Sequence, residues 1–233
     1  VPNGVYSKLA NLSKPDYGGH FNAHQSLVDG QISVGDAYIH GSWRTLLVGA
    51  LGSGGRSVFA LDVTDPQAPS LLFEIDEEDY PGLGYVFGQP LVAPLTNGRW
   101  AAIFGNGAEA GSSRLFVVYL ESPDSANTHV INTNAGTGLA TPALRPNLQG
   151  QIEEAYAGDL SGNVWKFDLK NFTVAYGQPL FQARDANNNV QPITGGVTIG
   201  LNEKIKPASV MVYLGTGRYI YDGDNFAEAT PVH

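Results

Sequence analysis

The segment Trp43–Pro66, which reads WRTLLVGALGSGGRSVFALDVTDP, decides the fold of this protein. It holds an apolar run that ends on Gly49, a glycine-rich turn, and a second apolar run that ends on an acidic residue. Short runs of β-branched and aromatic residues separated by glycine-rich turns are typical of adjacent antiparallel strands. The segment therefore predicts two neighbouring strands of one sheet.

The same pattern recurs along the chain at a regular interval. The glycine-closed runs are Trp43–Gly49, Trp100–Gly105, Glu154–Gly158 and Val210–Gly215. Their closing glycines are 56, 53 and 57 residues apart, and we expect turn geometry with positive φ to explain these and the neighbouring glycines. A period of about 55 residues indicates a stacked or radial repeat.

Further apolar runs flank each glycine-closed strand. A run that ends on an acidic residue follows it, in Val58–Asp62, Phe116–Glu121, Val164–Asp168 and Tyr219–Asp222. Another run precedes it, in Ile32–Ile39, Tyr85–Leu95, Gly138–Leu144 and Ile193–Leu201. The first three units add a last run, in Leu71–Ile75, Thr128–Ile131 and Pro179–Gln182. Four short antiparallel strands per unit predict the blade of a β-propeller.

Two other all-β folds are less compatible with the repeat. A β-sandwich has many short strands, but nothing in it requires a period, and a parallel β-helix repeats at roughly 20–30 residues per coil. We therefore predict an all-β propeller with four-stranded blades. Its expected parts are an N-terminal loop or linker at 1–27, units at 28–82, 83–136 and 137–192, and a partial fourth unit at 193–233.

The composition narrows the classes of function. The 233 residues include no cysteine, which excludes disulfides, thiolate metal sites and a cysteine nucleophile. The net charge of −9 disfavours nucleic acid and anionic membrane surfaces as partners. No apolar run reaches the roughly 18 residues of a membrane span. The first residue is Val1, so we expect a piece of a longer chain, and the low lysine content, the absence of cysteine and the abundance of glycine, asparagine and threonine favour an exported bacterial protein.

Five ordered segments together resemble one known family. Besides Trp43–Pro66 they are Leu83–Gly107 (LGYVFGQPLVAPLTNGRWAAIFGNG), Ala155–Leu169 (AYAGDLSGNVWKFDL), Pro179–Thr194 (PLFQARDANNNVQPIT) and Met211–Tyr219 (MVYLGTGRY). In this order and at this spacing they resemble the C-terminal β-propeller of the PilY/PilC family of type IV pilus tip-associated proteins. The resemblance extends over residues 24–222, most of the chain.

The resemblance implies a non-enzymatic, exported protein at the pilus tip or outer surface of a Gram-negative bacterium. It implies roles in pilus assembly, control of retraction, twitching motility and adhesion. Minor pilins are the implied partners, and a host or surface receptor is a further candidate. The family's propeller normally has a further blade before Val28–Gly30 and more strands after the GTGRY-like segment. An incomplete or truncated propeller is therefore expected.

The resemblance also implies a calcium loop, which is degenerate here. Family members often carry an EF-hand-like loop, D-x-D/N-x-D-G-x-x-D, just before the strand that reads AYAGDL. The matching positions are Arg145, Asn147, Gln149, Gly150 and Glu153. Calcium needs clustered oxygen ligands, but an arginine replaces the first carboxylate and only Glu153 is negative. We predict weak or no calcium binding at Asn147, Gln149 and Glu153, and expect no other cofactor.

The remaining polar clusters are interpreted as turns or loops. The segments Asp185–Asn189 and Asp222–Asn225 predict turns in which the Asx side chains cap their own backbone. His20 and His24 have the spacing of one helix face, but no helical pattern surrounds them, so zinc is disfavoured. The acidic run consists of Glu74, Asp76, Glu77, Glu78 and Asp79, of which the last four are the candidate partner-binding residues. It predicts a solvated loop and is also the candidate surface for a basic partner.

Three classes of function remain open. The first is an interaction module without catalytic residues, in which loops such as Asp76–Gly84 and Gly107–Ser113 bind other proteins. The second is a quinoprotein-like dehydrogenase, because AGDLSGNVWKFDL resembles the tryptophan-docking repeat of pyrroloquinoline-quinone enzymes. That motif occurs in full only once here, and no calcium pair can be assigned. The third is a generic propeller scaffold of another surface system.

Overall fold

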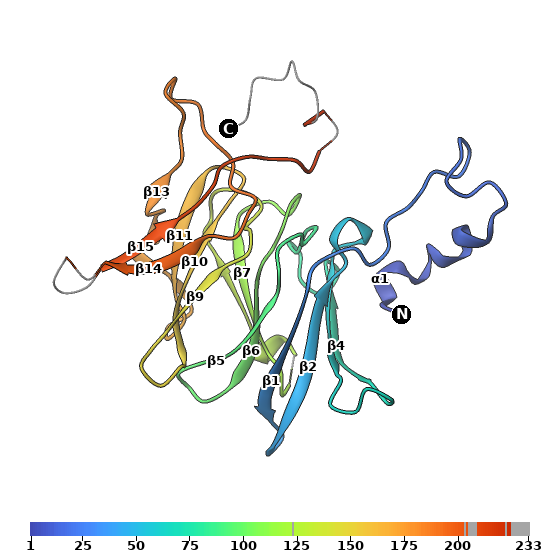
Figure 1. Ribbon diagram of the computed structural model, residues 1–233, viewed down its shortest axis with the longest axis horizontal. Coiled ribbons are helices and arrows are strands. Elements are labelled where there is room, and N and C mark those ends of the chain that lie inside the picture. The colour runs from blue at the N-terminus through green and yellow to red at the C-terminus, as the bar shows by residue number, and fades with distance from the viewer. Residues whose placement is uncertain (123, 203, 205–208, 222, 225–233) are drawn as a thin grey trace.

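The computed structural model describes residues 1–122, 124–202, 204, 209–221 and 223–224 (Figure 1). Its strands form separate antiparallel sheets, which we call blades 1 to 4 in chain order. Blade 1 consists of β1 (Ile32–Ile39), β2 (Ser42–Ala50), β3 (Ser57–Asp62) and β4 (Ser70–Asp76). Blade 2 consists of β5 (Leu91–Pro94), β6 (Trp100–Gly105), β7 (Arg114–Tyr119) and β8 (Thr128–Asn132).

Blades 3 and 4 continue the arrangement. Blade 3 consists of β9 (Ala143–Pro146), β10 (Ile152–Gly158), β11 (Asn163–Asp168), β12 (Thr173–Val174) and β13 (Phe181–Gln182). Blade 4 is the hairpin of β14 (Thr198–Asn202) and β15 (Ser209–Tyr213). β1 lies beside β5 and β14 beside β9, and an isolated bridge between Leu95 and Ile152 joins blades 2 and 3. The predicted all-β propeller with four-stranded blades is confirmed, and the described sheets do not close into a ring.

The hydrophobic core lies between the blades. Successive residues of a strand point to opposite faces of a sheet, so β6 contributes Phe104 to the core shared with blade 1 and Ile103 to the core shared with blade 3. The ring of Phe104 stacks on that of Phe116 with the centroids 5.3 Å apart. Trp165 of blade 3 is 1% exposed within the second core. A blade buried on both faces explains why WAAIFG is continuously apolar.

The N-terminal segment, expected as a loop or linker, is packed on blade 1. It contains α1 (Asn3–Tyr6) and a 3₁₀ turn at Leu9–Ser13. Val5 is buried against Leu51 and Phe59, on the face of blade 1 turned away from blade 2. The Glu74 carboxylate accepts hydrogen bonds from the backbone N–H groups of Asn3 (2.8 Å) and Gly4 (3.2 Å).

The expected strand at Tyr219–Asp222 is wrong for residues 219–221, which form no strand. The side chain of Asp224 is the physical reason. Its carboxylate accepts hydrogen bonds from the backbone N–H groups of Ile220 (3.0 Å) and Tyr221 (2.9 Å), and it pairs with Arg218 at 2.7 Å. These N–H groups cannot then pair with a strand. Asp222 and Asn225, and with them the turn predicted at Asp222–Asn225, lie outside the described residues.

Close approach between blades, rather than turn geometry, explains two of the closing glycines. Gly105 and Gly158 do not have positive φ. A Cβ atom on Gly105 would overlap with the carbonyl oxygens of Leu139 and Ala140, and one on Gly158 would overlap with the side chain of Ile193. Each of these neighbours belongs to the segment that leads into the next blade. The glycine therefore sets the distance between successive blades.

Candidate functional site

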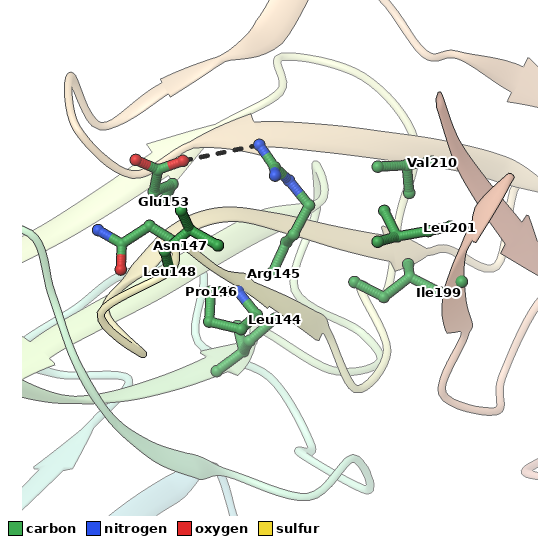
Figure 2. A pocket seen from close by; sticks show the side chains of 10 residues that line it. Leu144, Arg145, Pro146, Asn147, Leu148, Glu153, Ile199, Leu201 and Val210 are labelled. Carbon is green, nitrogen blue, oxygen red and sulfur yellow. Dashed lines mark ion pairs between the residues drawn. The ribbon is translucent and has the colours of Figure 1, made fainter. Parts of the chain in front are cut away.

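An apolar groove lies between β9 and the β14–β15 hairpin (Figure 2). Its volume is about 520 Å³. The lining residues are Leu144, Arg145, Pro146, Asn147, Leu148, Glu153, Ile199, Gly200, Leu201 and Val210. Figure 2 shows the aliphatic side chains of blade 4 opposite Leu144 and Arg145. The degenerate calcium loop, residues 145–153, therefore forms one side of this groove.

Local hydrogen bonding defines the turn in this loop. The Oδ1 atom of Asn147 accepts hydrogen bonds from the backbone N–H groups of Gln149 (2.9 Å) and Gln151 (3.0 Å). Its Nδ2 atom donates to the Oε1 atom of Gln151 at 3.2 Å. Gly150 has φ +80°, which glycine adopts without strain. Asn147 thus acts as the turn-forming residue of the β9–β10 hairpin.

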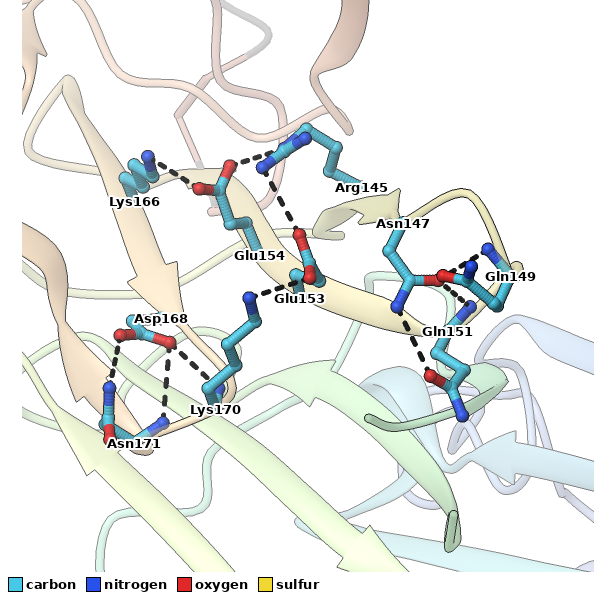
Figure 3. A network of polar contacts seen from close by, with 10 residues as sticks. All are labelled: Arg145, Asn147, Gln149, Gln151, Glu153, Glu154, Lys166, Asp168, Lys170 and Asn171. Atoms are coloured by element: carbon cyan, nitrogen blue, oxygen red, sulfur yellow. Dashed lines mark hydrogen bonds and ion pairs between the residues drawn. The ribbon is translucent and has the colours of Figure 1, made fainter. Parts of the chain in front are cut away.

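Glu154 is the centre of a charged network on the face of blade 3 that is turned towards blade 4 (Figure 3). Its carboxylate accepts hydrogen bonds from Arg145 Nε (2.6 Å), Lys166 Nζ (2.8 Å) and the Tyr156 hydroxyl (2.7 Å). The three donors come from β9, β11 and β10, which are neighbours in the sheet. Burial alone would raise the pKa of Glu154, but these donors outweigh it and lower the pKa to about 2.

Glu153 is held by a second set of cations. Lys170, just beyond β11, approaches its carboxylate at 2.7 Å, and Arg145 Nη2 lies 3.7 Å from it. Figure 3 shows the Arg145 guanidinium between the two glutamates. The hydrogen bond to Glu154 raises the pKa of Arg145, so this cation is permanent. Of the three candidate metal ligands in the loop, Glu153 therefore lies next to cations, whereas Asn147 and Gln149 form the turn beside it.

Glu154→Gln is expected to lower the unfolding free energy at neutral pH, and to lower it by less at acid pH. The pKa of Glu154 is about 2 in the folded state, below the ordinary value of 4.5. The Glu154 carboxylate therefore adds its whole contribution to the unfolding free energy above pH 4.5, and that contribution is lost as the pH falls towards 2. We expect a loss of about 1–2 kcal/mol in unfolding free energy at pH 7, since solvent screens the partly exposed cluster. Urea unfolding at pH 7 and pH 3 measures it. A deficit of equal size at both pH values would contradict the prediction.

The acidic run divides into two kinds of residue. Asp76 ends β4, and its Oδ1 accepts hydrogen bonds from the backbone N–H groups of Glu78 (2.9 Å) and Asp79 (3.2 Å). Glu77 pairs with Arg56 at 2.7 Å, and Arg56 also reaches Glu109 of blade 2 at 3.1 Å. Within the described part of the chain, the exposed Glu78 and Asp79 side chains have no hydrogen-bond or ion-pair partner. These two therefore differ from Asp76 and Glu77, whose carboxylates are held by contacts within the chain.

The other polar clusters serve local structure. Asp185 Oδ1 accepts hydrogen bonds from the backbone N–H groups of Asn187 (2.9 Å) and Asn189 (2.8 Å), which is the predicted Asx turn. His20 packs against Phe21, whereas His24 packs against Tyr17. Among residues 1–122, 124–202 and the shorter described ranges after them, no three His, Cys, Asp or Glu side chains are grouped as metal ligands.

Sequence reasoning missed Asp159, which joins blades 2 and 3. Its side chain is fully buried, and Oδ2 accepts hydrogen bonds from Trp165 Nε1 (2.7 Å), Ser113 Oγ (2.9 Å) and Asn163 Nδ2 (3.1 Å). Oδ1 accepts from the backbone N–H groups of Ser161 and Asn163, both at 2.9 Å. The available signal was an Asp six residues before a Trp in AGDLSGNVWKFDL. The docked tryptophan of this segment thus has a structural role here.

Comparisons with known proteins agree with this architecture. The family model of the PilY1 β-propeller domain matches residues 2–232. The type IV pilus biogenesis factor PilY1 homolog of Xylella fastidiosa is 38% identical over 97% of this chain and 17% of its own length. The type IV pilus biogenesis factor PilY1 of Pseudomonas aeruginosa strain UCBPP-PA14 is 37% identical over 99% of this chain and 22% of its own length.

A solved structure shows the same fold. The crystal structure of the Pseudomonas aeruginosa PilY1 C-terminal domain superposes with a TM-score of 0.81 at 35% identity, over 96% of this chain and 49% of that one. This chain spans about a fifth of the length of the curated relatives it matches. The resemblance found in the sequence is confirmed, and the chain belongs to the PilY1 β-propeller domain family.

Proposed function

We propose that this chain is a non-enzymatic interaction domain of a type IV pilus biogenesis factor. The observation that carries the proposal is the family match over residues 2–232, together with 37–38% identity to proteins named as type IV pilus biogenesis factors. In this proposal the domain is exported and acts at the pilus tip or outer surface of a Gram-negative bacterium. It supports pilus assembly, opposes retraction, and contributes to twitching motility and adhesion.

The packing supports a role as a rigid scaffold. Buried apolar residues join blade 1 to blade 2 and blade 2 to blade 3, so these blades move as one body. Two carboxylates on the faces between blades are used by the fold, because Asp159 accepts five hydrogen bonds and Glu154 accepts three. None of the described helices has both the length and the apolar character to cross a membrane. Loops between strands are left to contact partners.

The acidic loop after β4 is the proposed contact for minor pilins with a basic surface. Glu78 and Asp79 project from this loop, and the chain's net charge of −9 would steer a basic partner towards it. Arg56 holds the loop against blade 2 through Glu77 and Glu109. Such anchoring reduces the entropy that the loop loses when it binds.

Glu78→Ser together with Asp79→Ser tests this contact without disturbing the loop. We expect binding to purified minor pilins to weaken about threefold to tenfold, mainly through the association rate, and the remaining binding to depend less on salt. Biolayer interferometry at low and physiological salt measures both quantities.

The matched control changes the same net charge elsewhere on blade 1. Asp36→Ser together with Asp65→Ser removes two exposed carboxylates that lie outside the loop, and it should leave the association rate nearly unchanged. Equal losses for the two double variants would show a general charge effect and contradict the loop contact. Binding that neither variant alters would show that minor pilins use another surface.

A further inference from the structure

The residues of the loop at 145–153 do not fit the calcium ion that the family resemblance implies. Asn147 Oδ1 already accepts two backbone hydrogen bonds, and its Nδ2 donates to Gln151. Glu153, the only carboxylate at a ligand position, contacts Lys170 at 2.7 Å. The first ligand position holds a guanidinium, which repels a cation. A calcium ion needs six to eight oxygen ligands in one place, and this loop does not offer them.

The first ligand position holds a fixed positive charge instead, and two lysines from outside the loop add to it. Arg145 contacts Glu153 at 3.7 Å and Glu154 at 2.6 Å, so one guanidinium joins two adjacent carboxylates. Lys170 reaches Glu153 from the segment after β11, and Lys166 reaches Glu154 from β11 itself. The glutamate side chains are only 20% and 18% exposed. Without these cations, the partly buried carboxylates of two consecutive residues would repel each other.

We propose that Arg145 and Lys170 are built-in counterions of this loop, which lock the β9–β10 hairpin to β11 without a divalent cation. A bound cation would neutralise the carboxylate of the loop. Here the side chains of Arg145 and Lys170 neutralise Glu153, and Arg145 also contacts Glu154. The folding of blade 3 and the shape of the groove beside it are therefore independent of calcium. The proposal concerns the loop alone and does not depend on the proposed pilus function.

Thermal unfolding of the purified chain in calcium and in EGTA is the first test. A ligand that binds only the folded state raises the melting temperature, by about 5–10 °C at one hundred times its Kd for a domain of this size. We expect a difference of less than about 1 °C between the two conditions, and no saturable heat in calorimetric titration with calcium chloride. Saturable binding with a rise in melting temperature would overturn the proposal.

Two single variants test the counterions themselves. Arg145→Ala should lower the melting temperature by roughly 2–6 °C and Lys170→Ala, which removes one half-exposed ion pair, by roughly 1–3 °C, and each loss should be the same in calcium and in EGTA. Lys204→Ala is the control, because Lys204 is an exposed lysine outside this network, and it should leave the melting temperature unchanged. A melting temperature that neither Arg145→Ala nor Lys170→Ala alters would contradict the role assigned to them.

A gain-of-site variant gives the opposite readout. Arg145→Asp combined with Gln149→Asp restores carboxylates at two ligand positions, and it should melt lower in EGTA and recover several degrees in calcium. Gln149→Asp alone keeps Arg145 and should not respond to calcium. If the double variant folds only in calcium, that result supports the proposal equally well. A calcium response of Gln149→Asp alone would show that Arg145 does not exclude the ion, and would overturn it.

Discussion

Asp159→Ala is expected to cost about 3–5 kcal/mol of unfolding free energy, because it leaves buried donors without an acceptor. The carboxylate accepts five hydrogen bonds, among them those from Trp165 Nε1 and from Ser113 Oγ of blade 2. For a chain of 233 residues such a loss lowers the melting temperature by roughly 10 °C. Urea unfolding followed by tryptophan fluorescence measures it, and Trp165 is one of the three tryptophans that contribute to the signal.

Asp185→Ala is the matched control for this prediction. Asp185 makes the same pair of bonds to backbone N–H groups two and four residues ahead, but its turn is exposed. Removal of an exposed cap costs about 1 kcal/mol or less. The difference between the two variants therefore isolates the cost of the buried junction between blades. Similar losses for both would show that the local turn, rather than the junction, accounts for the effect.

Gly105→Ala is expected to destabilise the protein by about 2–4 kcal/mol, because the added methyl group must displace backbone. The carbonyl oxygens of Leu139 and Ala140 occupy the space that it would need. Backbone of the next blade yields less readily than a flexible side chain. We therefore expect blades 2 and 3 to separate slightly, which hydrogen exchange at β6 and β10 would detect together with the lower stability.

Gly215→Ala tests whether this effect belongs to the position or to the residue type. Gly215 closes the equivalent run in the fourth unit and has no positive φ, and no described atom lies within 4 Å of the place that an added methyl group would occupy. Alanine there should change stability by no more than about 0.5 kcal/mol in either direction. A large loss at Gly215 would mean that the glycine repeat reflects backbone conformation, and would contradict the explanation by close packing.

The strands that were predicted best are those with purely local signals. Ile32–Ile39 forms β1 at the expected bounds, because its alternation and the turn after it lie within one hairpin. The run Tyr85–Leu95 gives only β5 at Leu91–Pro94. Tyr85 instead exchanges backbone hydrogen bonds with Ala108 in an isolated bridge. A residue's apolar character does not reveal which segment its backbone will pair with.

In the candidate site, too, residue types could be predicted from the sequence but their contacts could not. The loss of ligand charge at Arg145 was visible in the sequence, because a guanidinium cannot ligate calcium. The partners of Arg145 were not, because they depend on the register of β9 against β10 and on the approach of Lys170. In the acidic run, Glu77, Glu78 and Asp79 are exposed, whereas Asp76 is the last residue of β4 and is half-buried, and the use of this run as a partner surface stays a prediction. Only its geometry separates Asp76, which caps the loop, from Glu78 and Asp79.

The sequence by itself determined the architecture and the family, because a repeat of about 55 residues, its glycine-closed strands and five ordered segments are all properties of residue order. The tertiary structure decided which of two similar turns or glycines is buried at a junction between blades and therefore contributes strongly to stability. Asp159 and Asp185 form the same kind of local turn, and Gly105 and Gly215 end the equivalent apolar run in two different units. They differ because burial at Asp159 and Gly105 is conferred by segments that are distant along the chain, such as Ser113, which lies 46 residues before Asp159, and no local pattern records such a contact.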